Sequence, residues 1–314
     1  MQLDFKRMLK YAAPTFVVVL SLVTSGAQSV AQADSDGDRH DRHDRRTKTT
    51  WGQATQLGDG FIQTYVTLRR KRPKAVGVRF SEDALLSFPD TESDGNWDVL
   101  DAGGNVVIAC CGHETVLLFP DEIRRTPFEH FVMNRNPFGH FPQGVYDIPH
   151  IDFHFYRITN EARTSIFVPV ADDMCIIPDP QPHPVPVTCE TYEIGVSPLP
   201  DDMFPDNHAN VGAVEPGMGN HLIDLTAPEF RGETFTHTWI YGAYDGELTF
   251  YEPMITIDFL MGLSGKVCTR IGLPEKQPTS DYYPTEYCIE SLDEDTQRYF
   301  EVSLGRFRKF KASR

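Results

Sequence analysis

The chain of 314 residues carries 45 acidic and 29 basic side chains, which gives a formal net charge of -16 at pH 7. This acidic balance argues against nucleic acid and anionic lipid as the main partners, because both attract basic surfaces. The 23 prolines are spread along the chain and would interrupt most long helices, so composition argues against a mainly helical protein.

The chain begins with the pattern of an export signal. Three basic residues lie within the first ten positions, before a mostly apolar run at residues 12–23, and Ala31–Ala33 fits a small-x-small cleavage site. The run is shorter than the ~20 residues that a helix needs to cross a bilayer. Residues 1–33 are therefore predicted to be a signal peptide, and the mature protein to be secreted or periplasmic without an integral membrane segment.

The mature chain is expected to contain a tail, two similar units and an extension. Residues 34–50 are charged or polar with nothing apolar to pack, which predicts a disordered tail. From Trp51 to Cys288, short apolar runs alternate with turn residues, as in strands. We therefore predict an all-β fold with two β-sandwich or barrel-like units. The expected boundaries are 51–170 and 171–262 for the two units and 263–314 for an extension with a disulfide loop.

An internal similarity supports the two units. Residues 118–130 and 225–237 share Leu, Glu, Arg, Phe and His at the same relative positions, and residues 149–155 match 253–259 at nearly the same offset. This register favours duplication of one β-rich unit, although short matches also arise by coincidence in β proteins.

The segment 137–156 concentrates histidine, aromatic and turn residues. Within it, His150, Asp152 and His154 alternate with one isoleucine and two phenylalanines. A period of two predicts a β-strand with one polar and one apolar face. An apolar run precedes the turn residues, so a β-hairpin is expected, with His140 in its long loop.

These side chains are candidate metal ligands, because zinc, manganese and iron commonly bind histidine and carboxylate. Strand residues four apart lie roughly 13 Å from each other, too far for two imidazoles to share one ion comfortably. A site would pair Asp152 with His150 or with His154 and take its other ligands from elsewhere. The alternative is a buried polar network in which Asp152 orients a histidine by hydrogen bonding. The predicted ligands of a divalent transition metal such as zinc are His140, His150, Asp152, His154, His221 and Glu252.

The second half repeats the hairpin pattern at residues 236–259, with a tight turn at Tyr244–Gly246. Met254, Thr256 and Asp258 occupy the positions of the two histidines and the aspartate, so the imidazole face is expected in one copy only. The glycine-rich segment 208–224 is expected to form turns. Its candidate polar residues are His208, Glu215 and His221, whereas His113, His130 and His237 are expected to be ordinary core or surface histidines.

Six cysteines suit an oxidising compartment. Cys175 and Cys189 flank one proline-rich loop and Cys268 and Cys288 flank another, so each pair is expected to form a local disulfide, although other connectivities stay open. The adjacent Cys110 and Cys111 would point to opposite faces of a strand. They are expected to be two buried thiols, since a bridge between neighbours needs a strained turn; one free thiol, a redox switch and a copper ligand are alternatives.

The long motif around the histidines resembles an uncharacterised family of bacterial extracytoplasmic proteins whose structural representative is a hypothetical protein from Thermus. The resemblance covers roughly Trp51 to Leu260 and implies a β-rich exported protein without an activity to carry over. The cysteine pairs and the chain beyond Leu260 do not belong to the pattern. The matching motifs are Thr126–His130, Gly139–His140, Tyr146–Tyr156, Met218–His221, Gly242–Gly246 and Glu252–Thr256.

The sequence therefore predicts an exported protein that binds a metal ion or small ligand. A metal-dependent hydrolase is one alternative, since Asp152 beside histidine suits a general base and a bound metal would activate water. No nucleophile elbow, phosphate loop or zinc-protease signature accompanies it. The other alternative is a structural or oligomer-forming envelope protein without a small-molecule site, whose partner would be further copies of the same chain.

Overall fold

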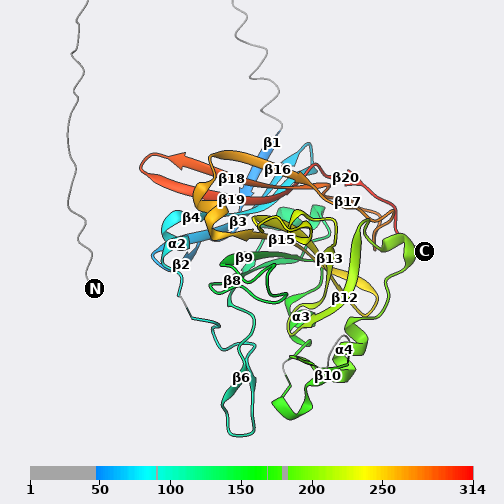
Figure 1. The fold of residues 1–314 in the computed structure, drawn as a ribbon. Coiled ribbons are helices and arrows are strands. Elements are labelled where there is room, and N and C mark those ends of the chain that lie inside the picture. The colour runs from blue at the N-terminus through cyan, green and yellow to red at the C-terminus, as the bar shows by residue number, and fades with distance from the viewer. Residues whose placement is uncertain (1–46, 90, 168, 179–182, 314) are drawn as a thin grey trace, which may run out of the picture. The chain divides into compact units, whose positions relative to one another are not determined.

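A computed structural model describes residues 47–313 apart from 90, 168 and 179–182 (Figure 1). The predicted signal peptide and residues 34–46 of the predicted tail lie outside the described residues. The structure instead places the end of that tail, Thr47–Thr50, in a strand, because its backbone pairs with residues 66–69 of a neighbouring strand.

Two seven-stranded antiparallel sheets make up most of the described chain (Figure 1). The first sheet joins strands from both ends of the sequence, and in order it contains β1 (Thr47–Trp51), β3 (Gly60–Arg69), β4 (Arg72–Ser81), β19 (Gln297–Gly305), β18 (Glu286–Glu294) and β16 (Gly265–Arg270), with β2 (Thr55–Leu57) paired to β3. The second sheet comes from the middle of the sequence, and in order it contains β12 (His208–Glu215), β13 (Gly219–Asp224), β14 (His237–Tyr244), β15 (Glu247–Thr256), β9 (His150–Tyr156), β8 (His130–Asn136) and β7 (His113–Leu118).

Short elements connect these strands. The described two-stranded sheets pair β5 (Val99–Leu100) with β6 (Val106–Ile108), β10 (Cys175–Ile177) with β11 (His183–Val185), and β17 (Tyr282–Tyr283) with β20 (Arg308–Lys309). The described helices are α2 (Glu82–Leu86), α3 (Asn160–Thr164), α4 (Cys189–Gly195) and α5 (Ile257–Gly262), with the 3-10 helices η1 (Asp121–Arg125), η2 (Ala171–Asp173), η3 (Asp201–Met203) and η4 (Pro228–Arg231).

The main hydrophobic core lies between the two sheets. Phe153 of β9 stacks on Phe80 of β4, with ring centroids 5.8 Å apart, and both side chains are fully buried. Alternate apolar residues of β3, β4, β18 and β19 meet those of β8, β9, β14 and β15 in one cluster. Strands with one apolar face bury it by packing face to face, which makes a β-sandwich. The all-β prediction is confirmed.

The internal duplication is not confirmed. Strands of the first predicted unit, β8 and β9, share one sheet with β12 to β15 of the second. Strands from residues 263–314 extend the other sheet through the pairing of β19 with β4. The sandwich is thus closed by strands that are far apart in sequence.

The predicted hairpins are present. β8 and β9 pair antiparallel around a long connection that carries His140. β14 and β15 are joined at Asp245 and Gly246, which both have positive φ, as a tight hairpin turn requires.

Two expectations for the second half were wrong. β15 ends at Thr256, whose hydroxyl oxygen accepts a hydrogen bond from the Phe259 amide and caps α5, so Asp258 lies on a helix. The glycine-rich segment 208–224 forms the paired strands β12 and β13, because its glycines serve a bulge and a tight turn instead of a continuous loop.

The cysteines form three disulfides. The predicted pairs Cys175–Cys189 and Cys268–Cys288 are confirmed. The expectation of two buried thiols at Cys110 and Cys111 was wrong, because these residues are bonded to each other. They lie in the connection between β6 and β7, so the opposite facing of neighbours on a strand does not apply to them.

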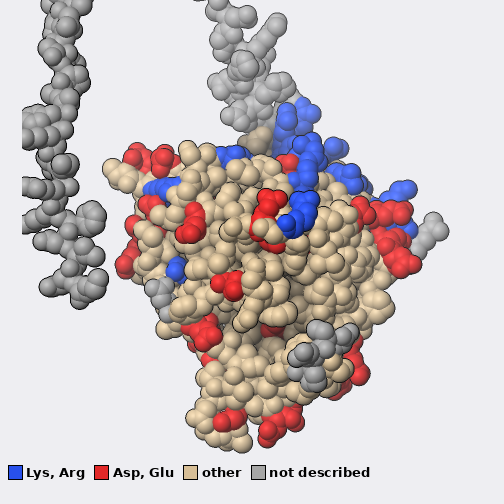
Figure 2. Space-filling view, in the orientation of Figure 1, with Lys and Arg blue, Asp and Glu red and all other residues tan. Residues whose placement is uncertain are grey.

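Acidic side chains are scattered over the face of the described chain that Figure 2 shows, and most of that face is uncharged. No helix in this part of the chain is both long and apolar enough to cross a membrane. Figure 2 shows Lys and Arg side chains gathered near β1, where the exposed residues of the β3–β4 turn include Arg69 to Arg72. The expectation that nucleic acid and anionic lipid are not partners rests on total charge and stays a prediction.

Candidate metal centre

The polar face of β9 is turned away from the sandwich core. Phe153 and Phe155 point into the core between the sheets, whereas His150, Asp152 and His154 point to the opposite side. The predicted alternation is therefore confirmed. All three polar side chains are nevertheless buried.

A second layer of side chains and loops covers this face. Tyr146, from the connection between β8 and β9, packs on Phe235 with ring centroids 5.0 Å apart, and Phe235 also contacts the His150 ring at 5.5 Å. Met218 and Met254 belong to the same apolar cluster. In Figure 1, α3, β6 and β10 lie on this side of the second sheet. The histidines thus lie in a low-dielectric setting between a sheet and its cover.

The first group joins His140, His150 and Asp152. The Nε2 atom of His150 lies 3.2 Å from Asp152 Oδ1, and that of His140 lies 3.6 Å from Asp152 Oδ2. The Asn136 amide donates a hydrogen bond of 2.6 Å to the same Oδ2. One ligand atom from each member of the triad lies within 4.8 Å of the others, close enough to hold one ion.

Backbone carbonyls fix the tautomers of these two imidazoles. His150 Nδ1 lies 2.6 Å from the carbonyl oxygen of Ile148, and His140 Nδ1 lies 2.7 Å from that of Phe141. Carbonyl oxygens only accept hydrogen bonds, so each Nδ1 carries the proton. Each Nε2 then presents a lone pair to the carboxylate unless the ring is doubly protonated. This is the orientation in which histidine binds metal.

The second group joins His154, His221 and Glu252. His154 Nε2 lies 3.3 Å from Glu252 Oε1, and His221 Nε2 lies 3.9 Å from Glu252 Oε2. His221 donates from Nδ1 to the carbonyl of Ala213 at 2.9 Å, so its Nε2 also carries a lone pair. Ligand atoms of these three residues again lie within 4.8 Å of one another. The strand registers bring them together. The pairing of β9 with β15 sets Glu252 beside His154, and His221 lies on β13, which is separated from β15 by β14.

All six predicted ligands therefore fall into two neighbouring triads, each with two histidines and one carboxylate. The strand spacing separates His150 from His154, and each takes its partners from a different part of the fold. His140 comes from the long loop, and His221 and Glu252 come from the second half of the sequence. The negative charge of Asp152 acts on Glu252, so the triads are electrostatically linked.

Burial and charge separate the protonation states of the two triads. In the first triad, burial favours a neutral Asp152, but the adjacent histidines have the larger effect and lower the pKa of Asp152. Asp152 in turn raises the pKa of His140, although burial alone would lower it. In the second, burial lowers the pKa of His154 to about 3 and that of His221 to about 4. Burial, followed by the charge of Asp152, raises the pKa of Glu252 well above its usual value. At neutral pH both imidazoles of the second triad are therefore uncharged and available as ligands.

Several polar atoms of the triads lack hydrogen-bond partners. The unsatisfied buried atoms include His150 Nε2, Asp152 Oδ1, both ring nitrogens of His154 and Glu252 Oε2. Buried polar groups without a partner destabilise a fold by about 1–3 kcal/mol each. Within each triad these atoms converge, which is the arrangement of groups that bind one ion together.

Sequence reasoning missed one polar contributor on the same face, Asn136, and named Glu215 without assigning it to a site. Asn136 of β8 lies opposite His150 and contacts Asp152, and its alternation with Asn134 along β8 was the available signal. Glu215, at the end of β12, forms a separate group with Cys110 and Cys111. Burial raises the pKa of Glu215 to about 7, and the charge of His140 opposes that rise.

The other candidate histidines belong to structural contacts. His208 packs on the Tyr241 ring and contacts the Asp206 carbonyl, away from both triads. His237 contacts the Tyr287 hydroxyl, and His113 contacts Thr91.

Substituting His130 with phenylalanine is expected to weaken the pH dependence of stability. His130 is buried and stacked on Tyr156 at 4.8 Å, and burial, followed by the charge of Arg163, lowers its pKa to about 4. Between that value and its ordinary value of 6.5, the unfolded chain binds more protons, so the free energy of unfolding falls as pH falls. Wild type should therefore lose on the order of 3 kcal/mol more than His130→Phe between pH 7 and 4. Urea unfolding at both pH values measures this, and parallel pH profiles would contradict it.

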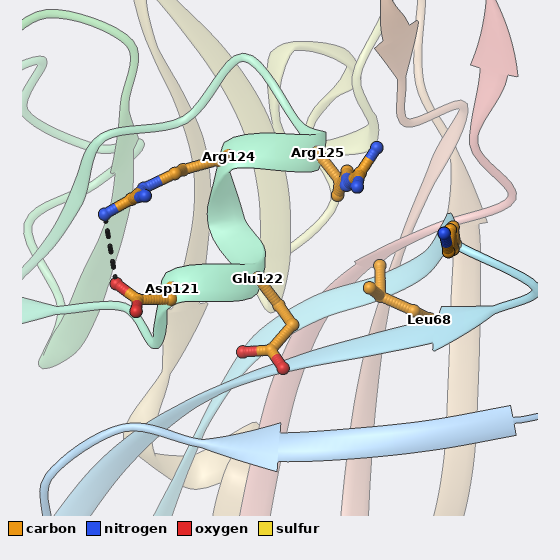
Figure 3. A pocket seen from close by; sticks show the side chains of 6 residues that line it. Leu68, Asp121, Glu122, Arg124 and Arg125 are labelled. Atoms are coloured by element: carbon orange, nitrogen blue, oxygen red, sulfur yellow. Dashed lines mark hydrogen bonds and ion pairs between the residues drawn. The ribbon is translucent and has the colours of Figure 1, made fainter.

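A surface pocket of ≈ 410 Å³ lies elsewhere, at the basic β3–β4 turn and η1 (Figure 3). Leu68 and Lys71 line it together with Asp121, Glu122, Arg124 and Arg125. Arg124 contacts Asp121 at 3.3 Å, and both side chains are highly exposed. None of the six predicted metal ligands lines this pocket.

Comparison with protein-family models, curated proteins and solved structures finds no match for this chain. The resemblance to the exported family therefore stays a prediction. Fold and site together define a disulfide-bonded, antiparallel β-sandwich with histidine and carboxylate clusters that could bind metal. Its three disulfides fit an oxidising compartment outside the cytoplasm.

Proposed function

We propose that this is an exported metal-binding protein whose two triads each hold a divalent transition metal such as zinc. The observation that carries the proposal is the shared orientation of His140, His150 and His221. Each donates Nδ1–H to a backbone carbonyl and directs Nε2 at a buried carboxylate. Such outer hydrogen bonds orient metal-binding histidines and increase their basicity.

The ligand chemistry favours a borderline transition metal. Each triad offers two imidazoles and one carboxylate, a donor set that suits zinc, iron or manganese better than calcium, which prefers oxygen alone. One cation in the first triad would satisfy His150 Nε2 and Asp152 Oδ1, and one in the second would satisfy Glu252 Oε2 and one ring nitrogen of His154.

Metal stoichiometry tests the proposal. The mature protein, purified without a histidine tag, is stripped with chelator, reloaded with zinc and measured by elemental analysis. Two ions are expected in wild type and about one in either His150→Ala or His154→Ala, because each substitution leaves the other triad intact. His130→Phe is the matched control, since His130 is buried on the same sheet face outside both triads.

The outcome that would overturn the proposal is specific. Correctly folded wild type that retains no zinc, manganese or copper at equilibrium would contradict it. A control variant that loses as much metal as His150→Ala would instead indicate that loss follows general disturbance of the fold.

Hydrolysis is a second candidate, favoured by the incomplete ligand sets. Three protein ligands leave a fourth tetrahedral position for water, as in catalytic zinc sites. The His140 side chain is 39% exposed, so solvent reaches the first triad. Zinc-loaded wild type should then cleave simple carboxylic or phosphate esters faster than Asp152→Asn and as fast as His130→Phe. Equal rates in wild type and Asp152→Asn would exclude this activity for those substrates.

A further inference from the structure

A third cluster lies outside both triads, where the Cys110–Cys111 disulfide faces the Glu215 side chain. Glu215 Oε2 lies 3.7 Å from Cys110 Sγ and 4.0 Å from Cys111 Sγ. The cysteines come from the connection between β6 and β7, and Glu215 comes from the end of β12, so tertiary folding alone makes the cluster. Cys110 is buried and Cys111 is partly exposed, which gives a reductant access to one sulfur.

The oxidised cluster leaves the carboxylate without a donor. Disulfide sulfurs carry no hydrogen, so neither contact is a hydrogen bond. Within the part of the chain that the structure describes, no other side chain or amide donates to the Glu215 carboxylate and no ion pair holds it, so the charge of His140 acts on it only from a distance. Two thiols, or a cation between two thiolates and the carboxylate, would supply what the disulfide lacks.

The Cys268–Cys288 disulfide provides an internal comparison. It also has a carboxylate beside it, that of Glu286. That carboxylate already has cationic partners, since Arg306 Nε lies 3.6 Å and Arg270 Nε 4.0 Å away. Proximity of a carboxylate to a disulfide is thus common to both clusters. Glu286 has ion-pair partners, whereas Glu215 has none among the described residues.

We propose that the Cys110–Cys111 pair is a reducible switch that, when open, forms a binding site for a thiophilic cation with Glu215. An exported dithiol reductant gives two electrons and two protons to the disulfide and becomes a disulfide itself, which leaves two thiols. Binding of one monovalent copper ion then releases two protons and gives a copper bis-thiolate next to the Glu215 carboxylate. Soft thiolates select cations such as copper(I) over the harder ions that suit the histidine triads.

The site is chemically separate from the two triads. Its ligands are sulfur atoms available only after reduction, whereas the histidine and carboxylate ligands are present in the oxidised protein. Zinc binding to oxidised protein and copper(I) binding to reduced protein are therefore measured separately, with the charge of His140 as the link between Glu215 and the first triad. His154→Ala should lose one of the two zinc ions and keep the reduction-dependent copper.

Copper(I) titration against a chromophoric competitor tests the proposal. Wild type and the Cys110→Ser/Cys111→Ser variant are compared with and without a non-thiol phosphine reductant, and thiol labelling with mass spectrometry identifies the opened disulfide. Reduced wild type should bind one more copper(I) than the reduced double variant, with thiolate-to-copper charge-transfer absorption. The subtraction removes any copper held by the other two disulfides, which both proteins retain.

Two carboxylate variants test the role of Glu215. Glu215→Gln should weaken the additional copper(I) at least tenfold, whereas Glu286→Gln should leave it unchanged. Equal copper(I) stoichiometry in reduced wild type and the double variant would overturn the proposal. So would a Cys110–Cys111 bond that resists the reductant in the folded protein.

Discussion

Replacing Arg163 with methionine is expected to lower the free energy of unfolding by about 3–5 kcal/mol, because it strands a buried charge. Arg163 contacts Glu114 through two parallel contacts of 2.8 and 2.9 Å, and both side chains are almost completely buried. Its guanidinium also lies over the rings of Trp97 and Tyr156. Without the arginine, the Trp97 indole is the one side-chain donor to the Glu114 carboxylate among the described residues.

The double variant Glu114→Gln/Arg163→Met should recover most of that loss, because neither charge remains. Denaturant unfolding at neutral pH measures both variants. Arg124→Met is the matched surface control, since the exposed Arg124–Asp121 pair in Figure 3 should contribute no more than about 1 kcal/mol. A double variant as unstable as Arg163→Met alone would show that packing of the arginine, not its charge, is what stabilises the fold.

The pair also matters for the candidate metal centre. Arg163 belongs to α3, and its charge lowers the pKa of both His130 and His154 in addition to the larger effect of burial. The arginine thus helps to keep His154 uncharged at neutral pH. Its removal should raise the pKa of His154, which NMR titration of the imidazole would detect.

Replacing Glu252 with glutamine is expected to change stability in opposite directions with and without metal. In metal-free protein, Glu252 Oε2 is buried without a partner, and burial raises the pKa of this carboxyl. Glutamine is neutral at every pH and avoids the cost of burying an ionisable carboxyl, so metal-free Glu252→Gln should be more stable than wild type by about 1–3 kcal/mol at pH 8.

Zinc should reverse the order. A metal at 1,000 times its dissociation constant stabilises the folded state by about 4 kcal/mol, and a glutamine amide is a poorer ligand than a carboxylate. Wild type should gain that stabilisation at the second triad and Glu252→Gln should gain much less. Thermal unfolding with chelator and with excess zinc would show the crossing.

The control for this experiment is another buried glutamate. Glu229 accepts a hydrogen bond from the Tyr146 hydroxyl at 3.2 Å and belongs to neither triad. Glu229→Gln should therefore leave the zinc-dependent increment unchanged. If Glu252→Gln loses stability equally in both conditions, its carboxylate contributes to the fold and not to metal binding.

The local patterns of the sequence predicted much of the secondary structure. Period-two alternation around Asp152 gave β9 and the division of its faces, and the turn at Asp245 and Gly246 gave the β14–β15 hairpin. The two local disulfides also followed from spacing, because each closes a short loop. Errors fell where neighbouring residues allowed two structures. Thr256 ends a strand by capping a helix, and glycines in 208–224 were compatible with a loop or with bulged strands.

The sequence by itself determined the chemistry of the candidate site. It shows which histidines and carboxylates share a strand face, and which of them lie too far apart along the strand to share an ion. The tertiary structure decided how they combine. His140 joins Asp152 through a loop that folds back on the sheet, whereas His221 and Glu252 join His154 through strand registers across β13, β14 and β15. The meeting of Cys110, Cys111 and Glu215 has the same origin. Local periodicity fixes only which way a side chain points, and contacts between distant segments depend on strand order, which is set by burial of the common core.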